Sequence, residues 1–214
     1  MQRILLASGN AAKLTELRAL TADLPVEVLG PDALPEGLPE VEEDGETFLD
    51  NAVKKALSAA EAAAAQLGDD VWALADDSGL CVDALDGAPG VFSARWAGHE
   101  GEGRDAANNA KLLAELDGRP PEERGASFWC LIAVARRGEL LFAAEGSVQG
   151  RILEAADGEG GFGYDPLFYH EPSGVSFARL SRQEKAAVSH RGAAVARLRN
   201  ILASVLPASA RRRP

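Results

Sequence analysis

The sequence predicts an α/β fold from three observations. Residues 3–7 form a short apolar run, followed by a turn at residues 8–10 and an amphipathic segment, which is the pattern of a strand, a tight turn and a helix. Residues 71–74 form a second apolar run, and the acidic stretch at residues 76–79 follows it, where ligands of open sheets bind. Between these two runs lies a long alanine-rich segment with helical spacing.

Length and composition indicate one domain of enzyme size. The chain has 214 residues and no linker rich in Pro, Gly or Ser, so we expect one domain over residues 1–207 and a disordered tail over residues 208–214. The formal net charge is −11, from 33 acidic and 22 basic residues, which opposes binding to nucleic acid or to an anionic membrane. An anionic ligand must therefore be held by a metal or by a few placed cations.

The cysteines and the amino terminus favour a cytoplasmic location. Cys81 and Cys130 lie in apolar runs without metal-ligand spacing, so reduced core thiols are favoured over a disulfide. The first residues run straight into a strand that is too short for a signal peptide, and no apolar segment approaches the length of a membrane span. We expect a soluble cytoplasmic protein with neither a membrane nor a nucleic acid as partner.

The turn at residues 8–10 is a candidate anion site. Asn10 can cap the following helix and Gly9 allows close backbone approach, so the turn offers free N–H groups and a positive dipole end to a phosphate. Lys13, one turn into the helix, adds a positive charge on the same side. The turn matches neither a P-loop nor a dinucleotide fingerprint, so an ordinary strand-to-helix turn remains the alternative.

An acidic loop precedes the long helix. Residues 31–45 are rich in Pro, Gly and acidic residues and predict a surface loop, and acidic runs are usually solvated. Thr47 and Asp50 resemble a capping box that begins a helix ending near Gly68. Lys55 lies close to the apolar face of this helix, so its ammonium group either turns toward the interior or reaches water along its apolar stem.

Two adjacent carboxylates follow the apolar run at residues 71–74. Strand alternation sends Asp76 and Asp77 to opposite faces, so at most one of them points straight at a given ligand. The alternative is an acidic turn that closes the strand. In both cases we expect a turn here and another short strand at residues 80–85.

The second half of the sequence predicts a hairpin, a glycine-rich loop and a last helix. The hairpin strands lie at residues 125–135 and 139–148, and their apolar density implies burial against helices. Residues 157–166 carry four glycines around two aromatic residues. This composition suits either a wall of a binding site against which a flat ligand stacks or a flexible surface loop. A capping box at residues 181–184 begins the last helix, where Lys185 opposes the dipole and hints at an anionic ligand.

Four segments taken together resemble the inosine triphosphate pyrophosphatase family, whose members hydrolyse dITP, ITP and XTP. They are Ser8-Gly9-Asn10-Ala11-Ala12-Lys13; Glu42-Glu43-Asp44-Gly45-Glu46-Thr47-Phe48 with Asn51-Ala52 and Lys55-Ala56; Ala75-Asp76-Asp77-Ser78-Gly79-Leu80 through Gly87-Ala88-Pro89-Gly90; and Gly161-Phe162-Gly163-Tyr164-Asp165-Pro166 with Glu184-Lys185 and Ser189-His190-Arg191. The match runs from Ile4 to about Leu202 in family order. Two departures are small: Ser8 stands where threonine is common, and Asp44 and Glu46 make the metal loop unusually acidic.

The resemblance implies a two-lobed α/β fold with a long central mixed β-sheet flanked by helices, an active-site cleft between the lobes, Mg²⁺ and a homodimer. It implies hydrolysis of ITP, dITP and XTP to the nucleoside monophosphate and pyrophosphate. Asp77 is similar to the family's proton acceptor, Glu42 and Asp77 look like the metal carboxylates, and Glu43 is the adjacent alternative. The positions that correspond to substrate-binding residues are Ser8, Gly9, Asn10, Ala11, Ala12, Lys13, Ser78, Phe162, Gly163, Tyr164, Asp165, Lys185, His190 and Arg191.

The charges agree with this interpretation. A triphosphate carries about four negative charges, so an acidic protein can bind it if Mg²⁺ bridges carboxylates to phosphate oxygens. Lys13 and Lys55 would neutralise the remaining charge. Which of the four carboxylates at positions 42, 43, 76 and 77 ligate the metal directly stays open.

Two other functions remain as alternatives. A nucleotide-binding sensor without turnover would keep the pocket, but the presence of Asp77, Glu42 and Lys13 together favours the enzyme. A related pyrophosphatase that acts on modified pyrimidines is disfavoured, because residues 162–165 and 190–191 match the purine group.

Overall fold

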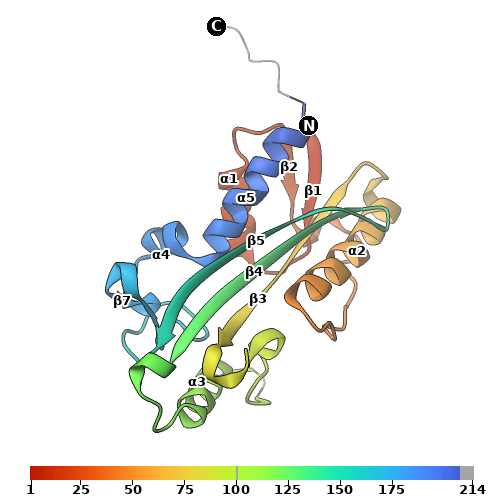
Figure 1. Ribbon diagram of the computed structural model, residues 1–214. Helices are drawn as coiled ribbons and strands as arrows, with labels where there is room; N and C mark the ends of the chain where they lie inside the picture. Colours follow the sequence, from red (N-terminus) through yellow and green to blue (C-terminus); the bar gives the residue numbers. More distant parts are fainter. Residues whose placement is uncertain (100, 208–214) are drawn as a thin grey trace, which may run out of the picture. The chain divides into compact units, whose positions relative to one another are not determined.

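The computed structural model describes residues 1–99 and 101–207, and it confirms the α/β class (Figure 1). The described strands form one seven-stranded sheet in the order β2-β1-β3-β4-β5-β6-β7. The sheet is mixed, because β1 pairs parallel with β2 and β3 whereas β6 pairs antiparallel with β5 and β7. The strands are β1 (Gln2–Leu6), β2 (Val26–Leu29), β3 (Trp72–Val82), β4 (Gly125–Arg136), β5 (Glu139–Ile152), β6 (Phe168–His170) and β7 (Val175–Ser176). The helices are α1 (Ala11–Leu20), α2 (Phe48–Leu67), α3 (Arg104–Glu115), α4 (Arg182–Val188) and α5 (His190–Val205).

The chain divides into two compact units. The first comprises Met1–Asp77, Leu131–Glu145 and Ala194–Pro214, and the second comprises Ser78–Cys130 and Gly146–Ala193. Strands β3, β4 and β5 each pass from one unit into the other. The single domain over residues 1–207 and the cleft between lobes stay predictions, and the predicted disordered tail at residues 208–214 lies outside the described residues.

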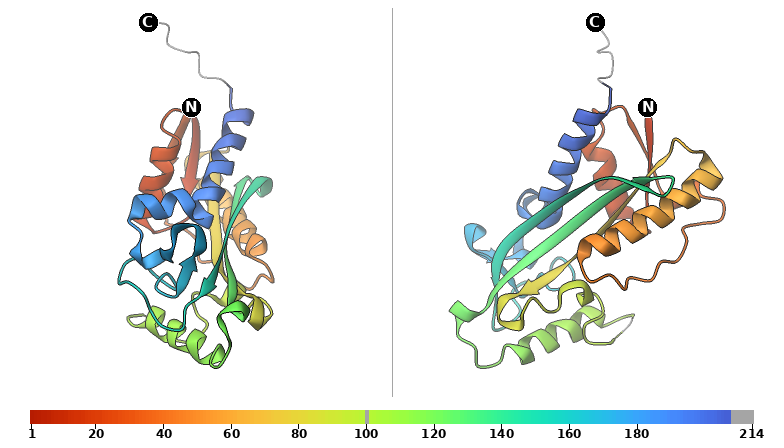
Figure 2. Two further views of the ribbon diagram at one scale, coloured as in Figure 1. Left: turned by 60° about the vertical axis from the view of Figure 1, so that its left-hand side comes forward. Right: turned by 45° about the vertical axis from the view of Figure 1, so that its right-hand side comes forward.

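In the first unit, helices cover both faces of the sheet. The fully buried face of α2 is built largely from alanines, which pack against Leu5 of β1, Ala73 and Ala75 of β3 and Ala133 of β4. Alanine side chains are short, so the helix lies close to the strands. Helices α1 and α5 lie on the side of β1 and β3 away from α2 (Figure 2). The alanines of α2 in this core are Ala52, Ala56, Ala59, Ala60 and Ala63.

In the second unit, α3 and a group of aromatic rings form the core. Leu112 and Leu116 are fully buried and pack in the same cluster as Phe128, Phe168 and Phe177. The rings of Phe128 and Phe168 lie 4.6 Å apart between centroids. Tilted aromatic pairs at this distance stabilise the fold beyond what the burial of their apolar surface contributes. This core anchors the segments that carry the second half of the candidate site.

The predicted turn at Asp76–Gly79 was wrong, because β3 continues through it from Trp72 to Val82. The short strand predicted at residues 80–85 is the end of β3 followed by a 3₁₀ turn, Asp83–Leu85. Two adjacent carboxylates are tolerated inside a strand because each has a cationic partner. Asp76 pairs with Lys13 of α1, and Asp77 pairs with Lys55 of α2.

The predicted last helix is two helices. Ser189 has extended backbone angles (ψ 159°) and ends α4, and its hydroxyl accepts a hydrogen bond from the N–H of Gly192 at the start of α5. A Cβ at position 192 would lie 1.9 Å from the carbonyl oxygen of Ala186, so only glycine fits against the end of α4. This break places His190 and Arg191 in the first turn of a new helix.

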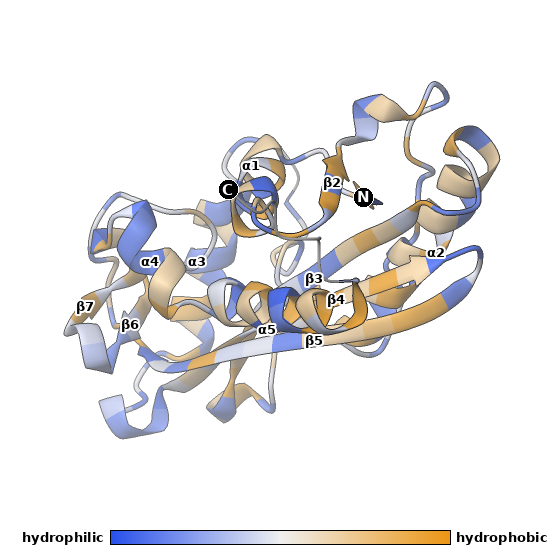
Figure 3. Cartoon of the chain, turned by 90° about the horizontal axis from the view of Figure 1, so that it is seen from above, coloured by the Kyte–Doolittle hydropathy of each residue, from blue (hydrophilic) through white to orange (hydrophobic). Residues whose placement is uncertain are grey.

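Strands β4 and β5 form the predicted hairpin, but the start of β5 is not buried. Most of β4 is buried, whereas Leu140 near the start of β5 is 45% exposed. Figure 3 shows that β5 nevertheless carries a strongly hydrophobic stretch. The prediction of burial was therefore wrong for this part of β5. Cys81 and Cys130 are free thiols, as predicted.

None of the described helices is long and apolar enough to cross a membrane.

Candidate functional site

The turn between β1 and α1, which the sequence predicts as a candidate anion site, has an ordered backbone. Asn10 caps α1, and its side-chain oxygen accepts hydrogen bonds from the N–H groups of Ala12 at 2.9 Å and Lys13 at 3.3 Å. The Ser8 hydroxyl accepts from the N–H of Asn10 at 3.2 Å. Residues 9–12 are exposed, and a Cβ added at Gly9 would meet no atom within 4 Å. The turn is therefore ordered and open to a ligand.

Lys13 does not stand alone beside this turn. Its ammonium group donates to both carboxylate oxygens of Asp76, at 2.7 and 2.8 Å. The Asp76 side chain is only 8% exposed, so its charge is balanced mainly by protein groups. Ligand phosphates at the turn would have to share Lys13 with Asp76.

Asp77 lies on the opposite face of β3 and belongs to a second charged cluster. Its Oδ1 accepts from Lys55 Nζ at 3.2 Å, and its Oδ2 accepts from Asn51 Nδ2 at 3.2 Å. Lys55 also donates to Glu43 of the acidic loop at 2.8 Å. The Asp77 and Lys55 side chains are 12% and 18% exposed. The sequence interpretation in which the Lys55 ammonium turns inward is therefore confirmed.

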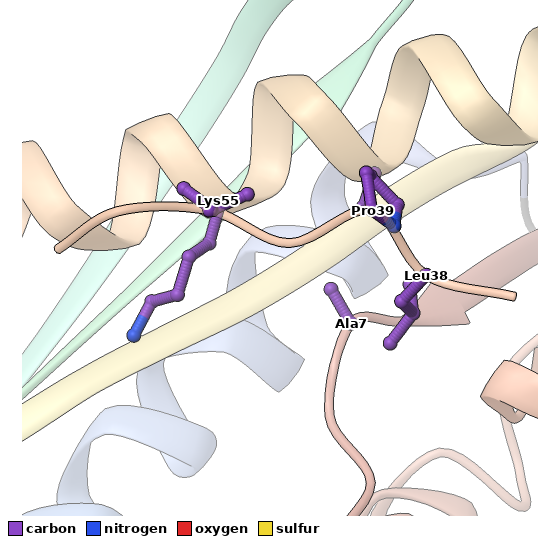
Figure 4. Close-up of a pocket in the computed structure, with 6 residues that line it drawn as sticks. Ala7, Leu38, Pro39 and Lys55 are labelled. Carbon is purple, nitrogen blue, oxygen red and sulfur yellow. The ribbon is translucent and has the colours of Figure 1, made fainter.

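A small hollow adjoins Lys55. Figure 4 shows the Lys55 side chain extending from α2 past β3, with Ala7, Leu38 and Pro39 lining the same pocket. Its volume is about 120 Å³, and Val41 and Ala59 complete the lining. Residues 38–41 of the acidic loop thus line a pocket together with Lys55 and Ala59 of α2.

Burial and charge act in opposite directions in this cluster. Burial raises the pKa of Asp77, although the Lys55 charge and the Asn51 hydrogen bond oppose the rise. Burial alone would lower the pKa of Lys55, yet Glu43 and Asp77 outweigh it and raise that pKa. Lys55 therefore stays protonated at neutral pH, and two carboxylates converge on one positive charge.

The carboxylates of this cluster fit a magnesium ion whose remaining ligands come from a bound substrate and water. Among residues 1–99 and 101–207, no three His, Cys, Asp or Glu side chains are grouped to hold a metal by themselves. Mg²⁺ commonly takes one or two carboxylates and completes its shell with substrate phosphates and water, and Asp77 and Glu43 already converge on one cation. Glu42, the other predicted metal carboxylate, is exposed.

The glycine-rich loop in the second unit is held by ion pairing. Asp165 is buried, pairs with Lys185 of α4, and accepts from the N–H of Phe162 at 2.8 Å. The Lys185 ammonium lies 4.4 Å from the centroid of the Phe162 ring. Asp165 thus supplies an anion that compensates the charge of Lys185 at the start of α4, and a ligand at this helix start stays a prediction. Phe162 itself is 63% exposed.

Helix α3 holds the same loop from its other side. Asp105 accepts from the N–H of Gly163 at 2.6 Å, and Asn109 donates to the Gly163 carbonyl at 3.0 Å. The buried Tyr164 hydroxyl donates to the Ser93 carbonyl at 2.9 Å. Because these contacts hold residues 163–164 in place, they argue against a flexible surface loop here.

The last predicted residues meet at the start of α5. His190 is buried, with its ring stacked on Phe128 at 4.8 Å between centroids and 16° between planes. Arg191 donates to the Ser78 hydroxyl at 3.2 Å. The second unit thus joins Arg191 to Ser78, the residue that follows Asp77 on β3, and places the neighbouring His190 ring against Phe128.

Sequence reasoning missed some side chains that hold these groups in place. Asn51 stands in one of the family segments with no role predicted for it, although it and Lys55 are four residues apart and so share one face of α2. That spacing could have identified it. Phe128 and Asp105 carried no such signal, because their contacts with His190 and Gly163 cross long stretches of sequence.

Residues 4–201 match the sequence profile of the Ham1 family. The chain belongs to the Ham1 family. It is 48% identical over 202 residues to a Geobacter sulfurreducens protein named dITP/XTP pyrophosphatase, with 94% of this chain and 97% of that protein covered. An Anaeromyxobacter protein of the same name is 48% identical over 226 residues, with 93% and 96% covered.

Solved structures of Ham1 proteins agree with this membership. A HAM1 protein from Coxiella burnetii matches with a TM-score of 0.86 at 38% identity, covering 96% of this Ham1-family chain and all 100% of the other. The Staphylococcus aureus Ham1 protein matches with a TM-score of 0.82 at 38% identity, covering 94% and 98%. The mixed α/β sheet is therefore the fold of the family.

Proposed function

We propose that this protein hydrolyses non-standard purine nucleoside triphosphates, ITP, dITP and XTP, to the nucleoside monophosphate and pyrophosphate, and so removes them from the nucleotide pool. The observation that carries the proposal is the end-to-end similarity, at 48% identity, to proteins named dITP/XTP pyrophosphatase. The ordered turn before α1 and the carboxylate cluster at Asp77 suit this reaction, because one can bind phosphate and the other can bind a cation and orient water.

In the proposed complex, the triphosphate binds to residues of the first unit. The N–H groups of Gly9 and Ala11 in the turn and the Lys13 ammonium contact phosphate oxygens, and Lys55 adds a second cation. Asp77 would hold Mg²⁺ together with Glu43 or Glu42. The metal, when bound, would neutralise phosphate charge and stabilise the leaving pyrophosphate.

The proposed reaction is a displacement at the α-phosphorus. Asp77 orients a water molecule and accepts its proton while the water oxygen forms a bond to the α-phosphorus. The bond from the α-phosphorus to the oxygen bridging to the β-phosphorus breaks, and pyrophosphate leaves with the electron pair. Asn51 and Lys55, which both bond to the Asp77 carboxylate, keep it in one orientation for this step.

We propose that the base binds to residues of the second unit. The exposed ring of Phe162 can stack on a purine, and Lys185 and Asp165 hold that ring in place. Ser78, His190 and Arg191 offer polar groups that pair with a 6-oxo purine and leave an exocyclic amino group at that position unpaired. Such a mismatch at a buried site costs about 1–3 kcal/mol, which would select against adenine nucleotides.

The bond that is broken distinguishes this function from other phosphatases. We expect incubation of the protein with ITP and Mg²⁺ to release inosine monophosphate and pyrophosphate in equal amounts, both measured by chromatography. ATP under the same conditions serves as the control and should react far more slowly. Release of single phosphates with a diphosphate product would exclude the proposed reaction, and tight binding without product would favour the sensor.

We also propose that the protein works as a cytoplasmic homodimer. The exposed start of β5, with Leu140 at its edge, offers an apolar surface that a second copy could cover. Light scattering at micromolar concentration should give twice the mass of one 22.4 kDa chain. A dilution series is the control, and the mass of one chain at every concentration would contradict the dimer.

A further inference from the structure

Asn51 is a polar side chain sealed inside the first unit. It lies in the first turns of α2 and has 0% exposure, in a helix whose other buried positions are alanines. Burying an amide is unfavourable unless its donor and acceptor both find partners. The two partners of Asn51 come from different segments of the chain, and both segments carry proposed metal carboxylates.

The two ends of the amide reach these segments separately. The side-chain oxygen accepts from the N–H of Gly45 at 2.8 Å, at the end of the acidic loop that carries Glu43. The side-chain nitrogen donates to Asp77 Oδ2 at 3.2 Å. A Cβ at position 45 would lie 2.7 Å from the Asn51 oxygen, so the loop backbone approaches the amide closely. One neutral group thus ties the loop to the strand.

We propose that Asn51 is a positioning residue that couples the acidic loop to Asp77 and holds both at the spacing the reaction needs. The proposal rests on the proposed pyrophosphatase function. A primary amide places a donor and an acceptor on two separate atoms of one short, uncharged side chain, so it can bond to two segments at once. Aspartate would place a like charge against Asp77, and leucine would leave the Gly45 N–H without its partner.

The alternative is that Asn51 only stabilises the start of α2. That start already has its own capping box, in which the Asp50 side chain accepts from the N–H of Thr47 at 2.9 Å and the Thr47 hydroxyl accepts from the N–H of Asp50 at 3.2 Å. Asp50→Ala therefore loosens the same helical turn, yet the contacts described for Asp50 include neither Asp77 nor the Gly45 N–H. It is the matched control for a purely structural effect.

The test compares Asn51→Leu, Asn51→Asp and Asp50→Ala. We expect Asn51→Leu to lower kcat for ITP about 10- to 100-fold, as loss of a group that orients a metal ligand typically does, while Asp50→Ala stays within about twofold despite a lower Tm. Amide hydrogen exchange at Gly45 should accelerate in Asn51→Leu but stay slow in Asn51→Asp, which keeps the acceptor. Asn51→Asp should nevertheless lose as much kcat as Asn51→Leu, because it lacks the donor to Asp77.

Two results would overturn the coupling. One is an Asn51→Leu protein whose kcat matches that of Asp50→Ala, and the other is an Asn51→Asp protein with wild-type kcat. If Asn51→Leu does not fold, Asn51→Ser, which is too short to reach both partners, takes its place with the same expectations. If the wild-type protein does not hydrolyse ITP, the proposed function fails. The coupling is then tested by the NMR chemical shift of the Asp77 carboxyl carbon. An unchanged shift between wild type and Asn51→Leu would refute the coupling.

Discussion

We expect Asp77→Asn to lower kcat for ITP by at least about 10²–10⁴-fold, the loss typical of removing a general base, while the protein stays folded. Asparagine keeps the size of the side chain but loses both the charge that holds a cation and the basicity that accepts a proton. It also leaves Lys55 paired with Glu43 alone. The loss should appear in kcat at saturating nucleotide and Mg²⁺, measured by pyrophosphate release.

The stability of this variant should change much less than its activity. Burial raises the pKa of Asp77 in the folded protein, so at pH values above that pKa the ionised carboxylate is less favourable in the folded state than in the unfolded state. A neutral side chain removes this unfavourable contribution, but it also removes one of the two carboxylates that raise the pKa of the largely buried Lys55. The two effects oppose each other, and we expect a Tm at pH 7 close to that of wild type.

Asp70→Asn is the matched control for Asp77→Asn. Asp70 precedes the same strand and forms an exposed ion pair with Arg3, which contributes little to stability. Its substitution should leave kcat unchanged. An Asp77→Asn protein that is folded and turns over ITP at a near-normal rate would remove the proposed role of Asp77, and would leave Glu42, Glu43 and Asp76 as the carboxylates to test.

The second large effect is the loss of activity on metal removal. We expect turnover of ITP to fall to background after dialysis against EDTA and to return on addition of Mg²⁺. The two lysines proposed to bind the triphosphate already form ion pairs with carboxylates. Lys13 pairs with Asp76, and Lys55 pairs with Glu43 and Asp77. A triphosphate with about four negative charges needs further positive charge in a protein of net charge −11. Full activity in EDTA would contradict the metal requirement.

A pair of variants identifies the second metal carboxylate. If Glu43 holds the metal with Asp77, Glu43→Gln should raise the Mg²⁺ concentration at half-maximal activity, whereas Glu42→Gln should not. Glu43 bonds to Lys55 within the cluster, and Glu42 is exposed on the same loop, so the two substitutions are matched in chemistry and in distance along the chain. The reverse result would make Glu42 the ligand. The Tm of each variant without metal controls for misfolding.

The sequence by itself determined the local structure of this protein. Asn10 caps α1, Thr47 and Asp50 form the capping box of α2, and Ser181 and Glu184 form that of α4, as predicted. These signals are readable because a cap satisfies N–H groups within three residues of itself. Strand alternation likewise sends Asp76 and Asp77 to opposite faces, since that geometry depends on neighbouring residues alone.

Only the tertiary structure decided which charges meet. Lys13 and Asp76 are 63 residues apart in sequence, and Lys55 and Asp77 are 22 apart, so no local pattern pairs them. The same pairings explain why β3 does not turn at Asp76: partners on two helices make buried carboxylates tolerable inside a strand. A buried polar group requires a partner, but its position in the sequence does not name that partner, because folding brings distant segments into contact.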